Sequence, residues 1–284
     1  DDASDPFQQM VYLQEGDAPP ERLVISYAAT DNNYTTYLLV KVLNASDFSV
    51  YKEYELNENT YFKNPAFSEP FSLYGVTVVC DLSGIIYIIS TDVENDVYYY
   101  RVNKIDTNTD AITTIVGSPV AGGSGKSPRT AVGIYSSGYL YITDAYYVYK
   151  IDATSMTEVS SKPAQSWPEE IRRQYISIIG DDSSCFICET ITWSNRYNED
   201  KNRFHTRIYE VNTSNLSLTR LVNENFYNNR FLAGYLFTSS RGGVVINGEP
   251  YFLVSDYYQY RDRQPPGFDK YEFSDHIHRI YTSS

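Results

Sequence analysis

Several residue types that mark common functional classes are scarce in this chain of 284 residues. It has only three cysteines, too few for the disulfide framework of a small secreted domain. Lys and Arg number 23 against 36 Asp and Glu. The formal net charge of −13 argues against nucleic acid and against an anionic lipid surface as partners. No apolar run approaches the roughly 20 residues of a membrane-spanning helix, so we expect no transmembrane segment.

Two of the cysteines, Cys185 and Cys188, have the C-x-x-C spacing of redox and zinc sites. They lie in an apolar, strand-like run, and on a strand positions three apart point to opposite faces. The spacing therefore opposes shared metal ligation. We expect two small residues that pack on a strand.

Tyrosine is abundant, with 29 copies, and hydrophobic residues make up 42% of the chain. This composition favours β-strands and is sufficient for a sizeable core. Tyr139, Tyr141, Tyr147 and Tyr149 alternate with the two-residue strand period, which predicts packing between neighbouring sheets. The first residues, DDASDPFQQM, are polar and acidic and do not resemble a targeting segment.

A repeated pattern runs along the chain. An apolar alternating run, a turn of Asn, Asp, Ser or Thr, and a second apolar run recur at residues 39–50, 102–115, 148–159 and 208–221, and a partial copy closes the chain at 277–284. Each copy predicts a β-hairpin. A second hairpin precedes each one, with tight turns at Ser83-Gly84, Ser137-Gly138 and Asn247-Gly248. The repeat unit therefore has four strands, A to D, and the last of five units lacks strand D.

The segment ITTIVGSPVAGG…RTAVGIYSSGYLYITDAYYVYKID (112–152) resembles NHL-type β-propeller repeats. The matching residues there are Gly117, Gly133, Ile134, Ser137, Gly138, Leu140, Tyr141, Asp144, Lys150, Ile151 and Asp152. A second match runs through Gly75, Val76, Asp81, Ser83, Gly84, Tyr87, Asp92, Val102, Lys104, Ile105 and Asp106. The resemblance implies a fold and no particular chemistry, because such propellers include binding modules as well as lyases and lactonases.

We therefore predict an all-β chain, a β-propeller of about five four-stranded blades whose last blade lacks its outer strand. Residues 1–284 would form one domain, with blades at about 8–55, 74–118, 130–160, 174–222 and 231–284. The unpaired edge of the last blade is a pairing hazard. Continuation of the chain, or a strand donated by another chain, would cover it, and a homo-oligomer could form in this way.

Four aspartates recur where strand B is expected to end: Asp31, Asp92, Asp144 and Asp256. We favour a role in which each side chain binds nearby backbone and stops the strand. The alternative is a central ring of metal ligands, as in lactonase-like propellers.

Loop length distinguishes the two faces of such a propeller. The A–B and C–D turns share one face and are short, apart from the first A–B turn. The long segments, at 56–73, 118–129, 160–174, 194–203, 222–236 and 257–270, fall on the other face. These segments carry the aromatic and Arg side chains typical of binding hot spots. The predicted binding residues are Tyr61, Phe62, Trp167, Trp193, Arg196, Tyr197, Tyr257, Tyr258, Tyr260, Arg261 and Arg263.

No nucleophile motif is present, and we name no catalytic residue. His276 and His278 are two residues apart and could hold zinc with His205 as a third ligand, although cross-strand or exposed histidines are the simpler interpretation. We expect a non-enzymatic, extracytoplasmic binding or assembly module, secreted or surface-anchored, with a protein or glycan partner and no cofactor. The alternatives are a metal-dependent hydrolase or lyase with a central-channel site, and a structural subunit that assembles by strand donation. Glycosylation sequons, relevant only in a secreted protein, occur at Asn33, Asn44, Asn212 and Asn215.

Overall fold

The structure is a computed structural model that describes residues 9–14, 21–30, 36–57, 76–81, 83–94, 97–119, 131–144, 147–163, 171–181, 183–193, 203–227, 234–260 and 270–279. All regular elements in these ranges are β-strands: β1 (Gln9–Gln14), β2 (Glu21–Thr30), β3 (Thr36–Asn44), β4 (Val50–Asn57), β5 (Thr77–Cys80), β6 (Ile85–Glu94), β7 (Val97–Asp106), β8 (Ala111–Pro119), β9 (Val132–Ser136), β10 (Tyr139–Thr143), β11 (Tyr147–Asp152), β12 (Thr157–Pro163), β13 (Ile171–Gly180), β14 (Cys185–Trp193), β15 (Arg203–Val211), β16 (Leu218–Tyr227), β17 (Gly234–Ile246), β18 (Glu249–Tyr260) and β19 (Lys270–Arg279). Within the ranges given, no helix has the length and apolar character of a membrane span.

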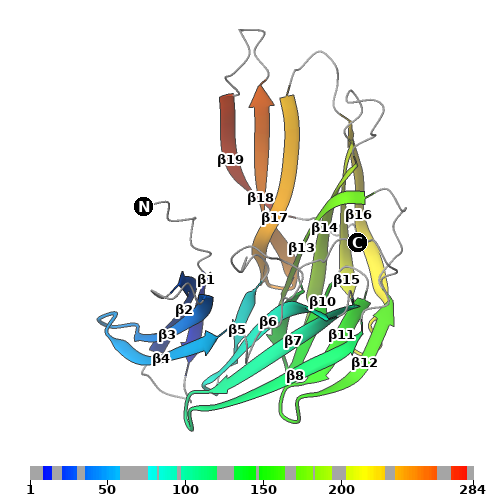
Figure 1. Cartoon of the computed structure of the whole chain (residues 1–284). Helices are drawn as coiled ribbons and strands as arrows, with labels where there is room; N and C mark the ends of the chain where they lie inside the picture. The colour runs from blue at the N-terminus through cyan, green and yellow to red at the C-terminus, as the bar shows by residue number, and fades with distance from the viewer. Residues whose placement is uncertain are drawn as a thin grey trace. The chain divides into compact units, whose positions relative to one another are not determined.

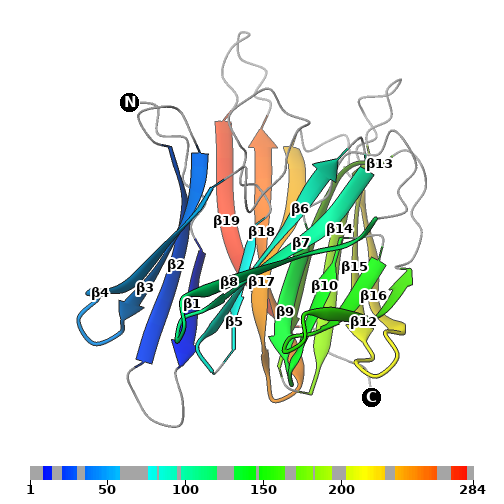
Figure 2. The same ribbon diagram turned by 60° about the horizontal axis from the view of Figure 1, so that its bottom comes forward.

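The strands form five sheets in which each strand pairs with its neighbours in the sequence (Figures 1 and 2). Blade 1 is β1–β4, blade 2 is β5–β8, blade 3 is β9–β12 and blade 4 is β13–β16. Blade 5 has three strands in the described part of the chain, β17–β19. This succession confirms the predicted fold class: an all-β, propeller-type series of four-stranded blades with a last blade that lacks its outer strand.

The chain divides into two compact units, Asp1–Tyr135 with Asp152–Glu158, and Ser136–Ile151 with Val159–Ser284. The division passes through blade 3. That the five blades form a single domain stays a prediction.

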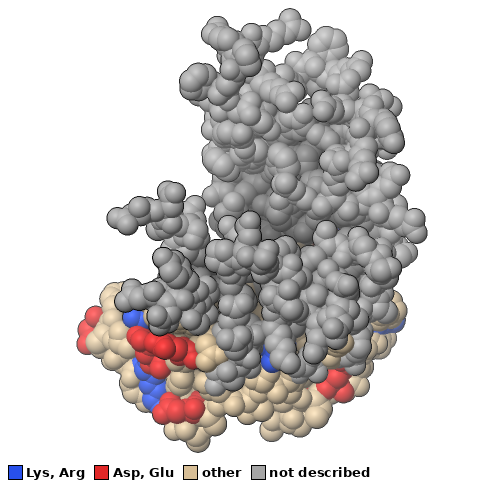
Figure 3. Space-filling model, viewed as in Figure 1, with Lys and Arg blue, Asp and Glu red and all other residues tan. Residues whose placement is uncertain are grey.

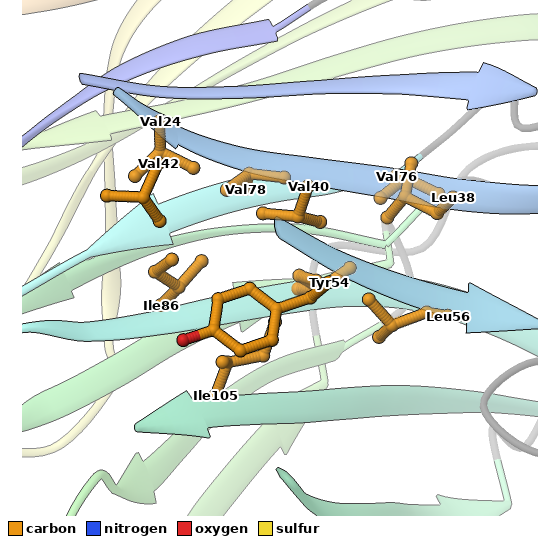
Figure 4. Packing of buried hydrophobic residues seen from close by; sticks show 11 residues of the cluster. Val24, Leu38, Val40, Val42, Tyr54, Leu56, Val76, Val78, Ile86 and Ile105 are labelled. Atoms are coloured by element: carbon orange, nitrogen blue, oxygen red, sulfur yellow. The ribbon is translucent and has the colours of Figure 1, made fainter. Parts of the chain in front are cut away.

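The core of the first unit lies between blades 1 and 2 (Figure 4). Val24, Val40 and Val42 from β2 and β3 face Ile86 and Ile105 from β6 and β7, and all five are fully buried. Because strand side chains alternate between faces, every second residue of β3 from Leu38 to Val42 enters this cluster, and β2 contributes Val24. A lone sheet could not bury both of its faces, and blades 1 and 2 bury one face each against the other.

A corresponding core in the second unit joins blades 4 and 5. Phe186, Cys188 and Ile208 are buried, and Val245 of β17 packs against them. Cys185 is buried on the other face of β14, and burial raises the pKa of its thiol. Both cysteines carry free thiols, which confirms the predicted packing role.

The tight A–B turns also agree with the prediction. In blade 3, Ser137 and Gly138 have φ of 47° and 82°, and in blade 5 Asn247 and Gly248 have φ of 54° and 77°. Two successive positive φ angles are the signature of a type I′ hairpin turn, whose twist matches that of the flanking strands. These turns set the register of their hairpins.

The recurrent aspartates behave differently from one another. Asp144 follows β10, where its side chain accepts hydrogen bonds from the Tyr147 backbone N–H at 2.8 Å and from the Tyr149 hydroxyl at 3.0 Å. This confirms the expected strand-ending role at that position. The prediction is wrong for Asp92 and Asp256, which lie inside β6 and β18 because the ladders continue beyond them to Glu94 and Tyr260. Asp31 lies outside the described residues.

Candidate functional site

The two ends of each blade differ in construction. At one end, the C–D turns of blades 1 to 4 repeat one backbone design. A carbonyl accepts a hydrogen bond of 2.7–2.8 Å from the N–H four residues later, and that later residue has φ between 56° and 60°. The donor and acceptor pairs are Phe48 with Asn44, Asp110 with Asp106, Met156 with Asp152, and Leu216 with Asn212.

The first residue of the turn also uses its side chain. The Asp152 carboxylate accepts hydrogen bonds from the backbone N–H groups of Thr154 and Ser155 at 3.0 and 2.7 Å. The Asn212 side-chain oxygen makes the same two contacts, with Ser214 and Asn215. Backbone and hydroxyl hydrogen bonds from Ser155 lower the pKa of Asp152. Asp and Asn are therefore interchangeable as acceptors in this turn.

A lysine of the preceding blade closes each later turn. Lys104 of blade 2 donates to the Ala153 carbonyl in the turn of blade 3, at 2.9 Å. Lys150 of blade 3 donates to the Thr213 carbonyl in the turn of blade 4, also at 2.9 Å. In the turn of blade 2, the Thr107 carbonyl accepts from Lys52 of blade 1.

Tyrosines reinforce these contacts between blades. The Tyr141 hydroxyl donates to the Thr213 carbonyl at 3.4 Å, so this tyrosine does pack against the next blade, as predicted. Tyr149 differs, since its hydroxyl binds Asp144 within its own blade. Tyr54 and Lys52 both bind the Asp110 carboxylate at 2.7 Å, and the hydrogen bond from Lys52, followed by that from Tyr54, lowers the pKa of Asp110. The polar side chains at this end thus hold blades together.

Some charged side chains on the described surface form ion pairs, among them Lys52 with Asp110 and Lys41 with Glu53. Figure 3 shows acidic and basic groups side by side in the first unit. Lys41 of β3 and Glu53 of β4, for example, form an ion pair of 3.0 Å across the blade 1 ladder. Such exposed pairs contribute little to stability.

The opposite end of each blade carries the B–C and between-blade connections, where the predicted binding residues are concentrated. Most of them, Tyr61, Phe62, Trp167, Arg196, Tyr197, Arg261 and Arg263, lie outside the described residues. Trp193 is the last residue of β14 and pairs with Ile171 and Arg203. Tyr257, Tyr258 and Tyr260 were expected in a loop, but they lie in β18, paired along β19. The ladder extends through them because aromatic residues favour strands.

The three histidines lie on third strands of their blades. His205 is in β15, opposite Ile191 and Asn225. His276 and His278 are in β19, opposite Val254 and Phe252. No group of three His, Cys, Asp or Glu residues that could hold a metal ion occurs among the residues that the structure describes. The histidine zinc site stays a prediction.

One depression of about 400 Å³ lies on the second unit, between blades 3 and 4. Its lining residues come from β12, β15, β16 and the C–D turn of blade 4: Lys162, Pro163, Tyr209, Leu216, Leu218 and Arg220. Sequence reasoning named none of them as binding residues, because they come from three separate segments, although Lys162 and Pro163 lie in the predicted long segment 160–174. The available signal was a difference from blade 3 alone, where Glu158 and Ser160 stand at the positions of Leu218 and Arg220.

Comparisons with known proteins give likenesses in structure alone. No protein-family model matches the chain, and no curated protein matches it in sequence. Similar solved structures include the β-propeller domain of the Trilobed protease from Pyrococcus furiosus, at 9% identity over 90% of this chain and 82% of that one, with a TM-score of 0.39. A levansucrase variant from B. megaterium is 10% identical over 96% and 82% of the two chains, with a TM-score of 0.42. The WD40 domain of SCAP from fission yeast is 8% identical over 99% and 68%, with a TM-score of 0.42.

Proposed function

We propose that this protein is a non-enzymatic binding module that takes a protein or glycan partner at the ends of its blades that carry the long connections. The carrying observation is the difference between the two ends of the blades. The C–D turns are short and internally hydrogen bonded, and they are bound to a neighbouring blade in three of four cases. A partner at that end would have to compete with these contacts.

The connections at the other end are longer and vary from blade to blade. Between-blade segments occupy 58–76, 120–131, 164–170 and 228–233, and the B–C connections of blades 4 and 5 occupy 194–202 and 261–269. Insertions of this size in a compact fold are commonly functional. Their Tyr, Trp and Arg content suits both protein hot spots and sugar-stacking surfaces.

We further propose an NHL-type propeller in an extracytoplasmic setting. The NHL pattern of blades 2 and 3 supports the first point. The second is supported by the position of three sequons, Asn44, Asn212 and Asn215, in C–D turns. Asn212 and Asn215 are exposed, so a glycan attached to either would extend into solvent. Mass spectrometry of the protein from its native source would show whether these asparagines are modified.

Site-specific photo-crosslinking tests the binding end. A benzoylphenylalanine introduced at position 197 or 263 should capture a partner from an extract of the native source. The same group at Thr154 or Ser214, in exposed C–D turns, serves as the matched control. Adducts at the turn positions, and none at 197 and 263, would contradict the proposal.

A glycan array separates the two partner classes. Labelled protein should bind defined glycans if the partner is a sugar, and the triple variant Trp193→Ala, Arg196→Ala, Tyr197→Ala should lose that binding. If the array shows no binding while the crosslinks identify a protein, the partner is a protein. Circular dichroism confirms that the variant is folded.

A second candidate function, assembly by strand donation, is favoured by the edge of blade 5. Among the described residues β19 pairs with β18 alone, so one side of this ten-residue strand has no strand partner there. An exposed strand edge is a template for another chain. Light scattering over a range of concentrations should show self-association that is lost on deletion of residues 277–284. A monomer at every concentration would contradict this candidate.

A further inference from the structure

The depression between blades 3 and 4 is a second place where this chain could bind a ligand, and its residues Lys162 and Pro163 directly precede the connection at 164–170. Its volume of about 400 Å³ is within the usual range of small-molecule sites. Pro163, Leu216 and Leu218 give it an apolar lining, and Lys162 and Arg220 add two cationic groups. This combination is unusual in a chain with a net charge of −13.

The register of blade 4 explains how these side chains come together. Tyr209 of β15 pairs with Arg220 of β16, and Leu218 lies two residues from Arg220, so all three occupy one face of the ladder. A β-bulge follows directly, because Ile208 pairs with Val222 and leaves Leu221 without an opposite residue. Bulges re-aim the neighbouring side chains and are frequent beside functional sites.

The two cations have no counterion among the residues that the structure describes. Neither Lys162 nor Arg220 makes a hydrogen bond or ion pair there. Burial raises the pKa of the Tyr209 hydroxyl, while the positive charge of Arg220 acts on that group and favours a lower pKa. Glu210 pairs with Thr219 and so belongs to the opposite face of the ladder. Glu189, which is buried, lies opposite Arg207 in the β14–β15 ladder.

Tyr209 forms a rigid wall of the depression. Its side chain is buried, and its hydroxyl accepts a hydrogen bond from the Arg207 guanidinium at 3.4 Å. Leu216 is also buried, and its backbone occupies the left-handed position of the C–D turn, with φ of 59°. Two of the lining groups are therefore fixed by the scaffold before any ligand arrives, which reduces the entropy lost on binding.

In the preceding blade, a hydrogen bond between side chains occupies the equivalent place. There Glu158, which corresponds to Leu218, accepts a hydrogen bond of 2.8 Å from the buried Tyr100 hydroxyl. The Tyr100 ring fits because Gly117 has no Cβ, which would lie 2.1 Å from the ring. Blade 4 has Leu218 at the position of this carboxylate and adds Arg220, so the acidic group that blade 3 alone places here is absent from blade 4.

From this geometry we propose that the depression binds a carboxylate that ends an apolar group, with the acid between Lys162 and Arg220 and the apolar body against Pro163, Leu216 and Leu218. The carboxylate of the ligand would replace the one that Glu158 supplies in blade 3. Two sources share this chemistry, a free arylalkyl acid and the C-terminus of a peptide that ends in an aromatic residue. The proposal does not rest on the partner proposed for the long connections, although Pro163 directly precedes the connection at 164–170.

Calorimetry at low salt with 4-phenylbutyrate and with an acetylated tetrapeptide that ends in Phe tests both sources. For a ligand of this size a dissociation constant on the order of 1 mM is expected. The neutral amide of each probe should bind about tenfold more weakly, because a charge-assisted contact is lost. Binding of one probe only would identify the source.

Variants locate the binding. Arg220→Met and Lys162→Met should each weaken it about tenfold, whereas Lys162→Arg should retain it. Leu218→Trp should block it by filling the space, and Lys41→Met, at a cation paired in β3, is the matched control. Thermal unfolding shows which variants are folded. Equal binding of acid and amide, no binding of either probe, or equal loss in the Lys41→Met control would overturn the proposal.

Discussion

The C–D turns of blades 1 and 4 have the same backbone and opposite surroundings. Phe48 and Leu216 share the hydrogen bond from their N–H to the carbonyl four residues earlier, and their φ angles are 58° and 59°. Yet Phe48 is 66% exposed and Leu216 is 1% exposed. Local hydrogen bonds therefore set the turn, while neighbouring blades decide whether its apolar residue contributes to stability.

The largest expected effect is a difference in the free energy of unfolding between variants of these two residues. Leu216→Ala should lower the free energy of unfolding by about 2–4 kcal/mol, because it removes buried methyl groups and leaves a cavity. Phe48→Ala should change it by less than about 0.5 kcal/mol, since the side chain is mostly in solvent. Urea unfolding measures both, and equal losses would show that the turn itself, and not its cover, carries the energy.

Removing the lysines that close the turns should have the next largest effect. Lys104→Met and Lys150→Met each delete a charged donor to a turn carbonyl and should cost about 1.5 kcal/mol. The matched control is Lys41→Met, which removes an exposed ion pair and should cost about 0.5 kcal/mol or less. If all three variants unfold at the same urea concentration, the contacts between blades are not stabilising.

At acidic pH, a turn that begins with Asp and a turn that begins with Asn should affect the free energy of unfolding differently, by a smaller amount than the changes above. Hydrogen bonds to the carboxylate lower the pKa of Asp152 in the folded state. The stabilisation that Asp152 provides is therefore fully present above the pKa of this carboxyl in the unfolded chain, about 4. It is lost as the pH falls through the lower pKa of the folded state. Asp152→Asn keeps the acceptor, as Asn212 does naturally, and should lose less stability between pH 5 and pH 2. A parallel decline of wild type and variant in urea unfolding would refute this.

The smallest effect concerns the left-handed position itself. Asn tolerates a positive φ better than Phe does, and Phe48 contributes little packing at its exposed site. Phe48→Asn should raise the free energy of unfolding by up to about 1 kcal/mol. Differential scanning calorimetry should record a higher unfolding temperature, and a lower one would show that Phe48 packs more than its exposure indicates.

Much of the fold follows from local sequence chemistry. The Ser-Gly and Asn-Gly pairs at 137–138 and 247–248 specify turns, because few other residues accept two positive φ angles in succession. The two-residue alternation places Val40 and Val42 in the core for an equally local reason. Strand ends were less predictable. Asp92 and Tyr257 remain in strands because a paired strand continues beside them, which is a property of two segments together.

The candidate sites show the same limit. Lys104 and Lys150 were visible in the sequence as parts of a repeated Lys-Ile-Asp pattern, but their role depends on a carbonyl about 50 to 60 residues away. The depression combines Lys162 with Tyr209 and Arg220, and no local pattern connects them. Positions where one blade differs from another are the best indication of a site in the sequence, because a residue that differs there does not make the contact that its counterpart makes.

The contacts between blades also have a direction. Lys52, Lys104 and Lys150 each donate a hydrogen bond to a turn that comes later in the chain. During synthesis the amino-terminal part emerges first, so each lysine meets its carbonyl only after the next blade has left the ribosome. A blade is therefore completed by its successor, and a growing chain carries one unfinished junction that moves along with elongation.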